Sequence, residues 1–473
     1  MKKFLCMLAL IFAFAWALSS CDIPFLPSAE TTATTSNETT TEKTTLEPEV
    51  TTPEVPDPPP TPSVGFAYKV NDDGKTCTIT GIGTCTDNDI YISDHIDGYE
   101  VTAIGDTAFV SCTPLSSVII PDSVTSIGYS AFCECINLMS ITIPDSVTSI
   151  GNGAFSFCSA LTNITIPDSV TSIGHAAFSH CSALTSVTIP DSVTSIGHGT
   201  FIKCSSLTNF TIPDSVTSIG DAAFSGCSAL TSVAIPDGVT SIGDDAFSGC
   251  DNLVVDEYDD AYYFGNDQNP YLILLRAKST DITSCTVHRK TQFIHSYAFS
   301  DRDSLTSIII PDSVTSIGSC AFSLCHSLTS VTIGDNVTSI GKDAFMYCSA
   351  LTSVTVPDSV TSIGDGAFSG CDALTSIIIP DSVTSIGGSA FYSCDALTSV
   401  TIGDSVTSIG DGAFSNCSAL TSVIFVNPNG WWCANSADAT SGTDLSADNL
   451  ADSVTATQYL KSIYNNYYWF RTE

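Results

Sequence analysis

Cysteine is the residue type whose number and spacing first suggest chemistry in this chain of 473 residues, which contains 20 cysteines. Most of them recur every 23 residues, as Cys135, Cys158 and Cys181 do. A zinc site needs several ligands that converge on one point, as paired CxxC motifs provide. One thiol in every 23 residues instead predicts a row of small, buried apolar side chains. Some disulfide pairing stays open for an exported chain, and Cys77 with Cys85 is the best candidate.

Aspartate and histidine are the other residue types that could bind a cation. One Asp follows each predicted strand, which would suit Ca²⁺, but neither a GGxGxD repeat nor an EF-hand spacing occurs. An Asp that caps its own turn is the favoured interpretation. His175 and His198 occupy the same position in neighbouring repeats, and variation at an exposed turn explains them better than a metal site. We therefore predict no metal site.

No group of residues in the sequence predicts catalysis. Serine is abundant because the repeat contains it, so any Ser–His–Asp triad drawn here would be accidental. No phosphate-binding glycine loop or dinucleotide motif is present. The chain has 14 basic against 50 acidic residues and a formal charge of −36, which argues against nucleic-acid binding because such binding needs cations that neutralise phosphates. We expect neither an enzyme nor a cofactor.

A 23-residue repeat positions all of these residues. One unit, residues 374–396, reads LTSIIIPDSVTSIGGSAFYSCDA, and its phenylalanine belongs to a series that includes Phe132, Phe155 and Phe178. The apolar residues at its start predict a short strand, which Pro-Asp ends. A fixed period of this length indicates a solenoid, in which each unit is stable only between neighbours. The phenylalanines and cysteines are predicted to form ladders in its core.

The repeat unit resembles the BspA-like, or Treponema-type, leucine-rich repeats of bacterial surface proteins. The resemblance rests on the pattern LxxLxLPxxLxxIGxxAFxxC, in which the period, Pro, Gly, Ala-Phe and Cys all coincide. It implies a leucine-rich repeat horseshoe with parallel strands on one face, attachment to the cell surface and binding of other macromolecules. The sequence departs from the pattern at Gly334 and Gly403, which replace the turn Pro, at Arg302, which replaces Cys, and at an insertion.

The N-terminal residues predict export. Met1-Lys2-Lys3 is basic, and the apolar run that follows is too short for a membrane span, so residues 1–20 read as a signal peptide. Leu18-Ser19-Ser20-Cys21 resembles the bacterial lipoprotein signal box, which implies a lipid on Cys21. Ordinary cleavage is the alternative. Residues 21–64 are rich in Thr and Pro and predict a disordered stalk between the anchor and the repeats.

The repeats are predicted to occupy residues 105–425, with a cap at each end. Residues 65–104 suit a hairpin that covers the first repeat. Residues 426–473 contain Trp431-Trp432 and a final aromatic cluster, which predict a C-terminal cap. We expect a monomeric solenoid.

The insertion at residues 254–298 is the one place that breaks the repetition, and it looks like a β-hairpin projecting from the solenoid. A basic, aromatic spot on a strongly acidic body would attract an acidic ligand. The candidate contact residues are Tyr262, Tyr263, Arg276, Lys278, Arg289 and Lys290. The alternative, which we favour, is that the cations neutralise nearby acids such as Asp256 and Glu257 while the aromatic rings pack.

These observations together predict a lipid-anchored protein of the bacterial cell surface. Its solenoid would bind macromolecules of a host or a neighbouring cell, as an adhesin does. Nearly identical repeats favour a protein or polysaccharide ligand that itself repeats. The alternative is a spacer or envelope scaffold without a defined ligand.

Overall fold

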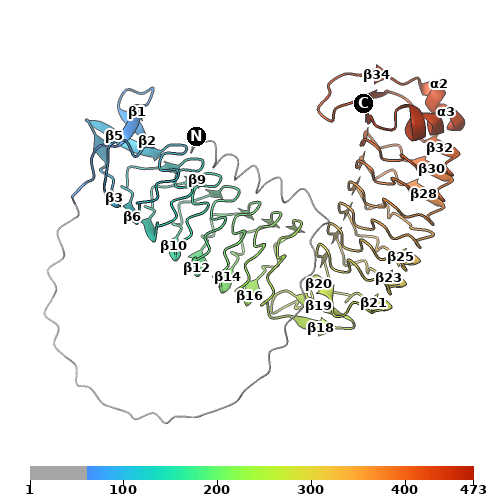
Figure 1. Cartoon of the computed structure of the whole chain (residues 1–473), viewed down its shortest axis with the longest axis horizontal. Helices are drawn as coiled ribbons and strands as arrows, with labels where there is room; N and C mark the ends of the chain where they lie inside the picture. Colours follow the sequence, from blue (N-terminus) through green and yellow to red (C-terminus); the bar gives the residue numbers. More distant parts are fainter. Residues whose placement is uncertain (1–60, 473) are drawn as a thin grey trace, which may run out of the picture.

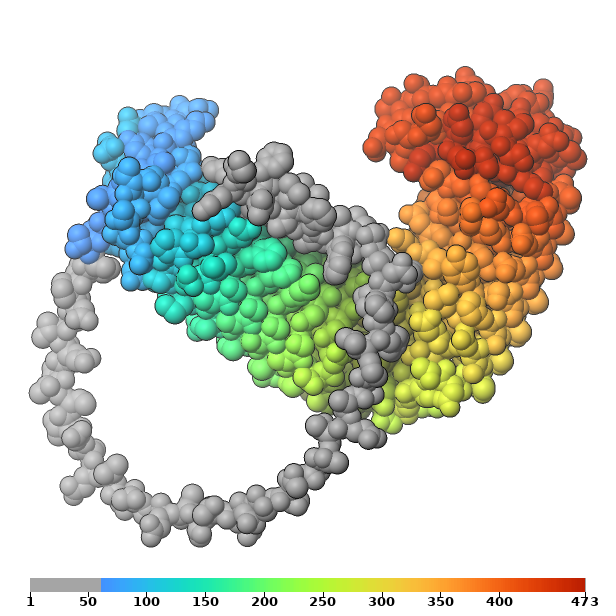
Figure 2. Space-filling model, in the orientation of Figure 1, coloured from blue at the N-terminus to red at the C-terminus, as the bar shows by residue number. Residues whose placement is uncertain are grey.

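The computed structural model describes residues 61–472. The predicted signal peptide, the lipidation site Cys21 and the stalk up to residue 60 lie outside the described residues. The described chain is a solenoid with two arms that together form a U, the first arm coloured blue to green and the second yellow to red (Figures 1 and 2). This confirms the predicted solenoid.

Each rung of the solenoid begins with a short parallel strand. In β10 (Asn163–Thr165) and β12 (Ser186–Thr188) the central residue is buried, the two flanking residues are exposed, and Ile164 pairs in register with Val187. Alternation places every second side chain on the same face of a strand, so one apolar residue per strand enters the core. The other strands of this first series are β3 (Asp89–Tyr91), β6 (Ser117–Ile119), β8 (Ser140–Thr142), β14 (Asn209–Thr211), β16 (Ser232–Ala234), β21 (Ser284–Thr286), β23 (Ser307–Ile309), β25 (Ser330–Thr332), β28 (Ser376–Ile379), β30 (Ser399–Ile402) and β32 (Ser422–Phe425).

A second series of parallel strands follows the Pro-Asp turn of each rung. The sequence predicted parallel strands on one face, and the structure adds this second row. The Ser-Ile step after each Val is also extended and pairs with the next rung, as Ser126 does with Ser149. Figure 1 shows the first series along the outer side of the U. The second series comprises β5 (Tyr99–Ile104), β7 (Ser126–Ile127), β9 (Ser149–Ile150), β11 (Ser172–Ile173), β13 (Ser195–Ile196), β15 (Ser218–Ile219), β17 (Ser241–Ile242), β20 (Ile273–Ala277), β22 (Phe293–Ile294), β24 (Ser316–Ile317), β26 (Ser339–Ile340), β27 (Ser362–Ile363), β29 (Ser385–Ile386) and β31 (Ser408–Ile409).

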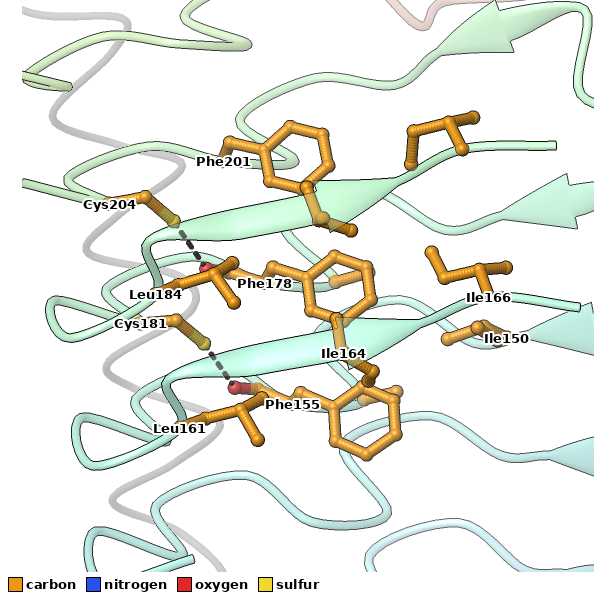
Figure 3. Close-up of a cluster of buried hydrophobic side chains, with 14 of the residues drawn as sticks. Ile150, Phe155, Leu161, Ile164, Ile166, Phe178, Cys181, Leu184, Phe201 and Cys204 are labelled. Carbon is orange, nitrogen blue, oxygen red and sulfur yellow. Dashed lines mark hydrogen bonds between the residues drawn. The ribbon is translucent and has the colours of Figure 1, made fainter. Parts of the chain in front are cut away.

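The predicted phenylalanine ladder forms the centre of the core. Phe155, Phe178 and Phe201 are fully buried and lie one above another (Figure 3). Their ring centroids are 5.5 and 5.6 Å apart and the rings are nearly parallel. The ladder runs from Phe109 to Phe247 in the first arm and resumes from Phe299 to Phe414 in the second.

The predicted cysteine ladder is also buried, and the structure adds a role for its thiols. Cys181 donates a hydrogen bond to the carbonyl oxygen of Phe155 at 3.1 Å, and Cys204 donates to that of Phe178 (Figure 3). Each thiol therefore ties its rung to the rung before it. Burial raises the pKa of Cys181 to about 12, so the thiol keeps its proton and remains a donor.

Replacing Cys181 separates these two contributions. We expect Cys181→Ala to lower the free energy of unfolding by about 1–3 kcal/mol, because the change leaves a void and removes the donor. Cys181→Ser keeps a donor and should lose less than Cys181→Ala. Urea titrations of the two variants and the unchanged protein provide the measurement. A Ser variant less stable than the Ala variant would show that only the apolar character of the thiol matters.

The N-terminal cap contains a hairpin formed by β1 (Ala67–Val70) and β2 (Thr76–Gly81). The solenoid nevertheless begins inside residues 65–104, because β2 pairs in parallel with β5, and β3 pairs with β6. The short β4 (His95–Ile96) pairs with β5 in antiparallel orientation. The cap is therefore an incomplete rung capped by a hairpin.

The insertion does not project from the solenoid, which corrects the prediction. Strands β18 (Asp256–Tyr258), β19 (Ala261–Phe264) and β20 form an antiparallel sheet, and β20 then joins the second series through β22. Ala261, Tyr263 and Leu274 are fully buried. Strands β21 and β22 already belong to a regular rung, so the irregular part is shorter than residues 254–298.

A partly buried polar junction joins the two arms beside the insertion. The backbone N–H of Phe247 donates to Nε2 of His295 at 3.3 Å, whereas the earlier ladder phenylalanines, from Phe109 to Phe224, donate to a carbonyl of the next rung. Burial lowers the pKa of His295, which keeps its ring neutral and able to accept this bond. The Asp244 carboxylate accepts from the backbone N–H of Ser319 at 2.9 Å and from its hydroxyl at 2.6 Å.

The C-terminal segment packs on the last rung. It contains β33 (Trp431–Ala434), β34 (Thr443–Asp444), α2 (Ala447–Ala451), α3 (Ser453–Gln458), the π-helix η1 (Tyr459–Ile463) and β35 (Tyr468–Arg471). Strand β35 pairs antiparallel with β31, which ends the parallel sheet. Trp431 and Trp469 are buried in the same core cluster as Phe425. No helix within residues 61–472 is both long and apolar enough to span a bilayer.

Candidate binding surface

Rows of threonine and serine cover the strand faces of the solenoid. Thr185 is exposed, and its hydroxyl donates to the carbonyl oxygen of Thr162 in the preceding rung at 3.0 Å. The same bond recurs along the rows, for example from Thr398 to Thr375. These hydroxyl hydrogens are thus used between rungs, and the rows offer a nearly uniform surface.

The aspartate and histidine side chains accept hydrogen bonds from backbone N–H groups of the next rung. The N–H of Asp404 donates to the carboxylate of Asp381 at 2.8 Å, so here an Asp caps the following rung rather than its own turn. His175 Nδ1 accepts from the N–H of His198 at 3.0 Å, and His198 Nδ1 lies 3.1 Å from the Asp221 carboxylate. Within residues 61–472, no three His, Cys, Asp or Glu side chains gather as a cluster able to hold a metal ion.

The insertion places only some of its predicted contact residues together. The Arg276 guanidinium lies 5.3 Å from the ring centroid of Tyr262, and the Lys278 ammonium lies 6.0 Å from it. Lys278 also forms an ion pair with Glu257 at 3.0 Å. Tyr263 faces the opposite side of β19 and is fully buried, so a ligand cannot reach it. The ion pair favours local neutralisation as the role of Lys278.

The two remaining cations of the insertion lie on a separate turn. Arg289 and Lys290 are exposed after β21, and the Lys290 ammonium donates to the carbonyl oxygen of Gln268 at 3.4 Å. The six predicted contact residues therefore do not form one patch. The sequence could not reveal this, because the distribution depends on how β18, β19 and β20 fold back.

A different surface concentrates the variation among rungs. We define the variable edge as the positions two and three residues before, and one and two residues after, each ladder phenylalanine. The strand positions repeat almost unchanged, whereas these positions carry charged, aromatic, aliphatic and small residues in different rungs. Three tyrosines on the edge are strongly exposed: Tyr297 at 39%, Tyr347 at 48% and Tyr392 at 40%. Aligning the repeats column by column would have revealed this surface.

The backbone of the variable edge is left-handed where it varies most. The second residue after the ladder phenylalanine has a positive φ in all 13 rungs. Glycine, which adopts this conformation without steric cost, occupies the position at Gly226, Gly249 and Gly370. Larger side chains occupy it elsewhere, including Phe157 at φ 62° and Tyr347 at φ 58°. Such residues cost about 1–2 kcal/mol each in this conformation.

A family model described as "BspA type Leucine rich repeat region (6 copies)" matches residues 91–207, 194–256, 277–398 and 338–458. Together these segments cover well over half of the chain. The chain belongs to the BspA-type leucine-rich repeat family. The match begins at β3 and reaches α3, so the BspA-type region includes parts of both caps. No curated protein matches the chain.

Several solved structures of bacterial leucine-rich repeat proteins are similar to this BspA-type chain. A leucine-rich cell surface protein of Faecalibacterium prausnitzii is 36% identical, and the match covers 78% of this chain and 96% of that one with a TM-score of 0.44. A Bacteroides ovatus leucine-rich repeat protein is 28% identical over 76% and 93% of the two chains, with a TM-score of 0.39. A Treponema pallidum leucine-rich repeat protein is 34% identical over 41% and 90%, with a TM-score of 0.39.

The C-terminal cap and the BspA-type rungs enclose a groove that includes part of the variable edge. Figure 2 shows the cap, in red, extending from the end of the second arm toward the space between the arms. The groove has a volume of about 1080 Å³. Tyr392, Tyr468 and Phe470 line it together with Asp365 and Asp411. Asp411 accepts a hydrogen bond from Tyr468, which raises the pKa of that phenol. Aromatic faces and hydrogen-bonding groups thus stand side by side.

Proposed function

We propose that this protein is a cell-surface, adhesin-like protein that binds a macromolecule of a host or a neighbouring cell through its variable edge. Its Faecalibacterium relative is described as a leucine-rich cell surface protein. In this proposal, Cys21 is the lipidated residue that anchors the chain to the membrane. The solenoid is a binding module without catalytic activity.

The retention of large side chains in left-handed positions carries the proposal. Tyr347 stands where Gly370 stands one rung later, and a Cβ built on Gly370 would lie 2.4 Å from the Tyr347 ring, so the ring covers that glycine. Replacement by glycine would remove the backbone strain. A strained residue that the fold does not require is a candidate for function.

The spacing of the exposed tyrosines favours a polysaccharide. Tyr297, Tyr347 and Tyr392 belong to the rungs of Phe299, Phe345 and Phe391, which are every second rung. Rungs about 4.8 Å apart place the tyrosines about 10 Å apart along the arm, comparable to a disaccharide unit. The three rings stand in different columns of the repeat, so a linear polysaccharide would meet one ring in every second rung while crossing the width of the variable edge. Carboxylates such as Asp365 supply acceptors for sugar hydroxyls.

A double variant tests this assignment. We expect Tyr347→Gly with Tyr392→Ser to weaken binding of the polysaccharide selected on a glycan array by at least about tenfold, because exposed aromatic anchors dominate such surfaces. Its stability should change by no more than about 1 kcal/mol, since relief of left-handed strain offsets the lost packing. Calorimetric titration and urea unfolding measure the two quantities.

The matched control is Arg276→Ser with Lys278→Ser, which removes the cations of the insertion and leaves the variable edge intact. It should bind the polysaccharide as the unchanged protein does. Loss of binding only in this control would move the site to the insertion. The spacer alternative would be favoured if the protein bound no glycan or protein on the arrays and if gene deletion caused an envelope defect. The uniform strand faces are consistent with that alternative.

A further inference from the structure

Cys85 and Cys112 differ from the other cysteines of the described chain. Both are partly exposed, whereas every other cysteine within residues 61–472 is buried. Both pack against the edge of the first-arm core. An oxidant in solution can therefore reach these two thiols and not the buried ladder.

The two cysteines occupy equivalent places in neighbouring rungs. The N–H of Cys112 donates to the carbonyl oxygen of Phe109 at 3.1 Å, and the N–H of Cys85 donates to that of Ile82 at the same distance. Both residues thus end the same kind of turn, three positions after the residue whose carbonyl accepts this bond. Cys85 is therefore the cysteine-ladder member of the incomplete rung in the N-terminal cap.

Contacts between the two turns place them against each other. A Cβ built on Gly81 would lie 3.8 Å from the Ala108 carbonyl oxygen. Phe66, which precedes the hairpin, packs edge-on against Phe109 with ring centroids 6.0 Å apart. Burial raises the pKa of Cys112, and the neighbouring Cys85 raises it further. Stacked residues in adjacent rungs have Cα atoms about 4.8 Å apart, within the disulfide range of roughly 4.4–6.8 Å.

The first rung also lacks the contact that occupies the other ladder thiols. From Cys135 to Cys250, each thiol donates to the carbonyl oxygen of a phenylalanine 26 residues earlier. The series starts at Cys135, and on the cap side of Phe109 the neighbouring ring is Phe66, which stands 46 residues before Cys112. The deeper thiols point toward a phenylalanine carbonyl of the preceding rung, which keeps them from pairing with each other. The Cys112 thiol has no such bond and can turn toward Cys85.

We infer that Cys85 and Cys112 form a disulfide that fastens the N-terminal cap to the first complete rung. In this step the two S–H bonds break and one S–S bond forms. The two electrons and two protons pass to a disulfide oxidant, which is reduced to two thiols. Cys77, the partner expected from the sequence, is fully buried, and its sulfur lies 3.8 Å from the Tyr99 carbonyl oxygen inside the core.

Differential alkylation of the full-length protein tests the inference. The protein is equilibrated with oxidised glutathione, unfolded in N-ethylmaleimide, reduced, and treated with iodoacetamide before peptide mass spectrometry. We expect the iodoacetamide label on Cys85 and Cys112 and the maleimide label on the ladder cysteines. Maleimide on both Cys85 and Cys112, or a disulfide between Cys85 and Cys77, would overturn the inference.

Hydrogen exchange gives a second readout that does not depend on mutant folding. Reduction of the unchanged protein should speed exchange in residues 61–104 by roughly tenfold or more, since the cross-link restricts opening of the cap. Cys85→Ser and Cys112→Ser should each show the fast exchange with or without reductant. If the exchange rate of residues 61–104 in the unchanged protein is the same with and without reductant, the disulfide is not present. These outcomes are independent of ligand binding at the variable edge.

Discussion

Phe178→Ala is expected to lower the free energy of unfolding by about 3–5 kcal/mol. The Phe178 ring is fully buried and stacks on Phe155 at 5.5 Å and on Phe201 at 5.6 Å. The substitution removes a large apolar side chain and two aromatic contacts at once, and the neighbouring backbones cannot close the void because their strands are held in register. Urea unfolding followed by circular dichroism gives the change.

Phe178→Leu is the control, because it keeps much of the apolar volume and removes only the aromatic stacking. It should lose less than half as much stability as Phe178→Ala. Because each rung contacts only its neighbours, hydrogen exchange should accelerate most in the first arm and least near the C-terminal cap. A loss below about 1 kcal/mol for Phe178→Ala would mean that the ladder is not the main source of stability.

Gly174→Ala should destabilise the protein by about 3 kcal/mol or more, although it adds one methyl group. A Cβ at Gly174 would lie 2.3 Å from the backbone nitrogen of Asn152 and 2.5 Å from the carbonyl carbon of Gly151. These atoms belong to the preceding rung and cannot rotate away as a side chain can. The second strands must therefore separate locally. Thermal and urea unfolding measure the loss.

Gly238 provides the matched comparison for Gly174. It stands where Ser192 and Ser215 stand in other rungs, and the nearest atom to a Cβ built there is 3.5 Å away. Gly238→Ser should leave stability unchanged or raise it by about 0.4–1 kcal/mol, because the unfolded chain loses freedom. Equal losses at the two glycines would refute the explanation by close backbone contact.

Much of the fold was predictable because the 23-residue period alone determines the stacking of the rungs. A 23-residue register for Phe132, Phe155 and Phe178 leaves only a stacked core as a way to bury every ring. The junction between the arms was not predictable, since Phe247 and His295 are 48 positions apart and the stretch between them includes the irregular insertion. Nothing in that stretch shows that β20 rejoins the second series, and so the hairpin was wrongly expected to project.

The candidate site was harder to predict than the core. The sequence drew attention to the cations of the insertion because they are rare in an acidic chain. The structure divides them between two places and binds Lys278 to Glu257. The variation along the edge can be read from aligned repeats, but its backbone conformation cannot, because residues such as Phe157 and Tyr347 do not suggest a left-handed backbone. The repeat register shows that these side chains share the position of Gly370, but only the structure shows that the backbone there is left-handed.

The nearest-neighbour contacts of the rungs have a consequence for how the gene can change. Insertion or deletion of one whole unit within an arm recreates every contact it interrupts, so recombination between repeats can lengthen or shorten either arm and still yield a folded product. The polar junction of Asp244, His295 and Ser319 tolerates no such exchange, because its partners occur once. Arm length can therefore drift among strains while the bend of the U is inherited intact.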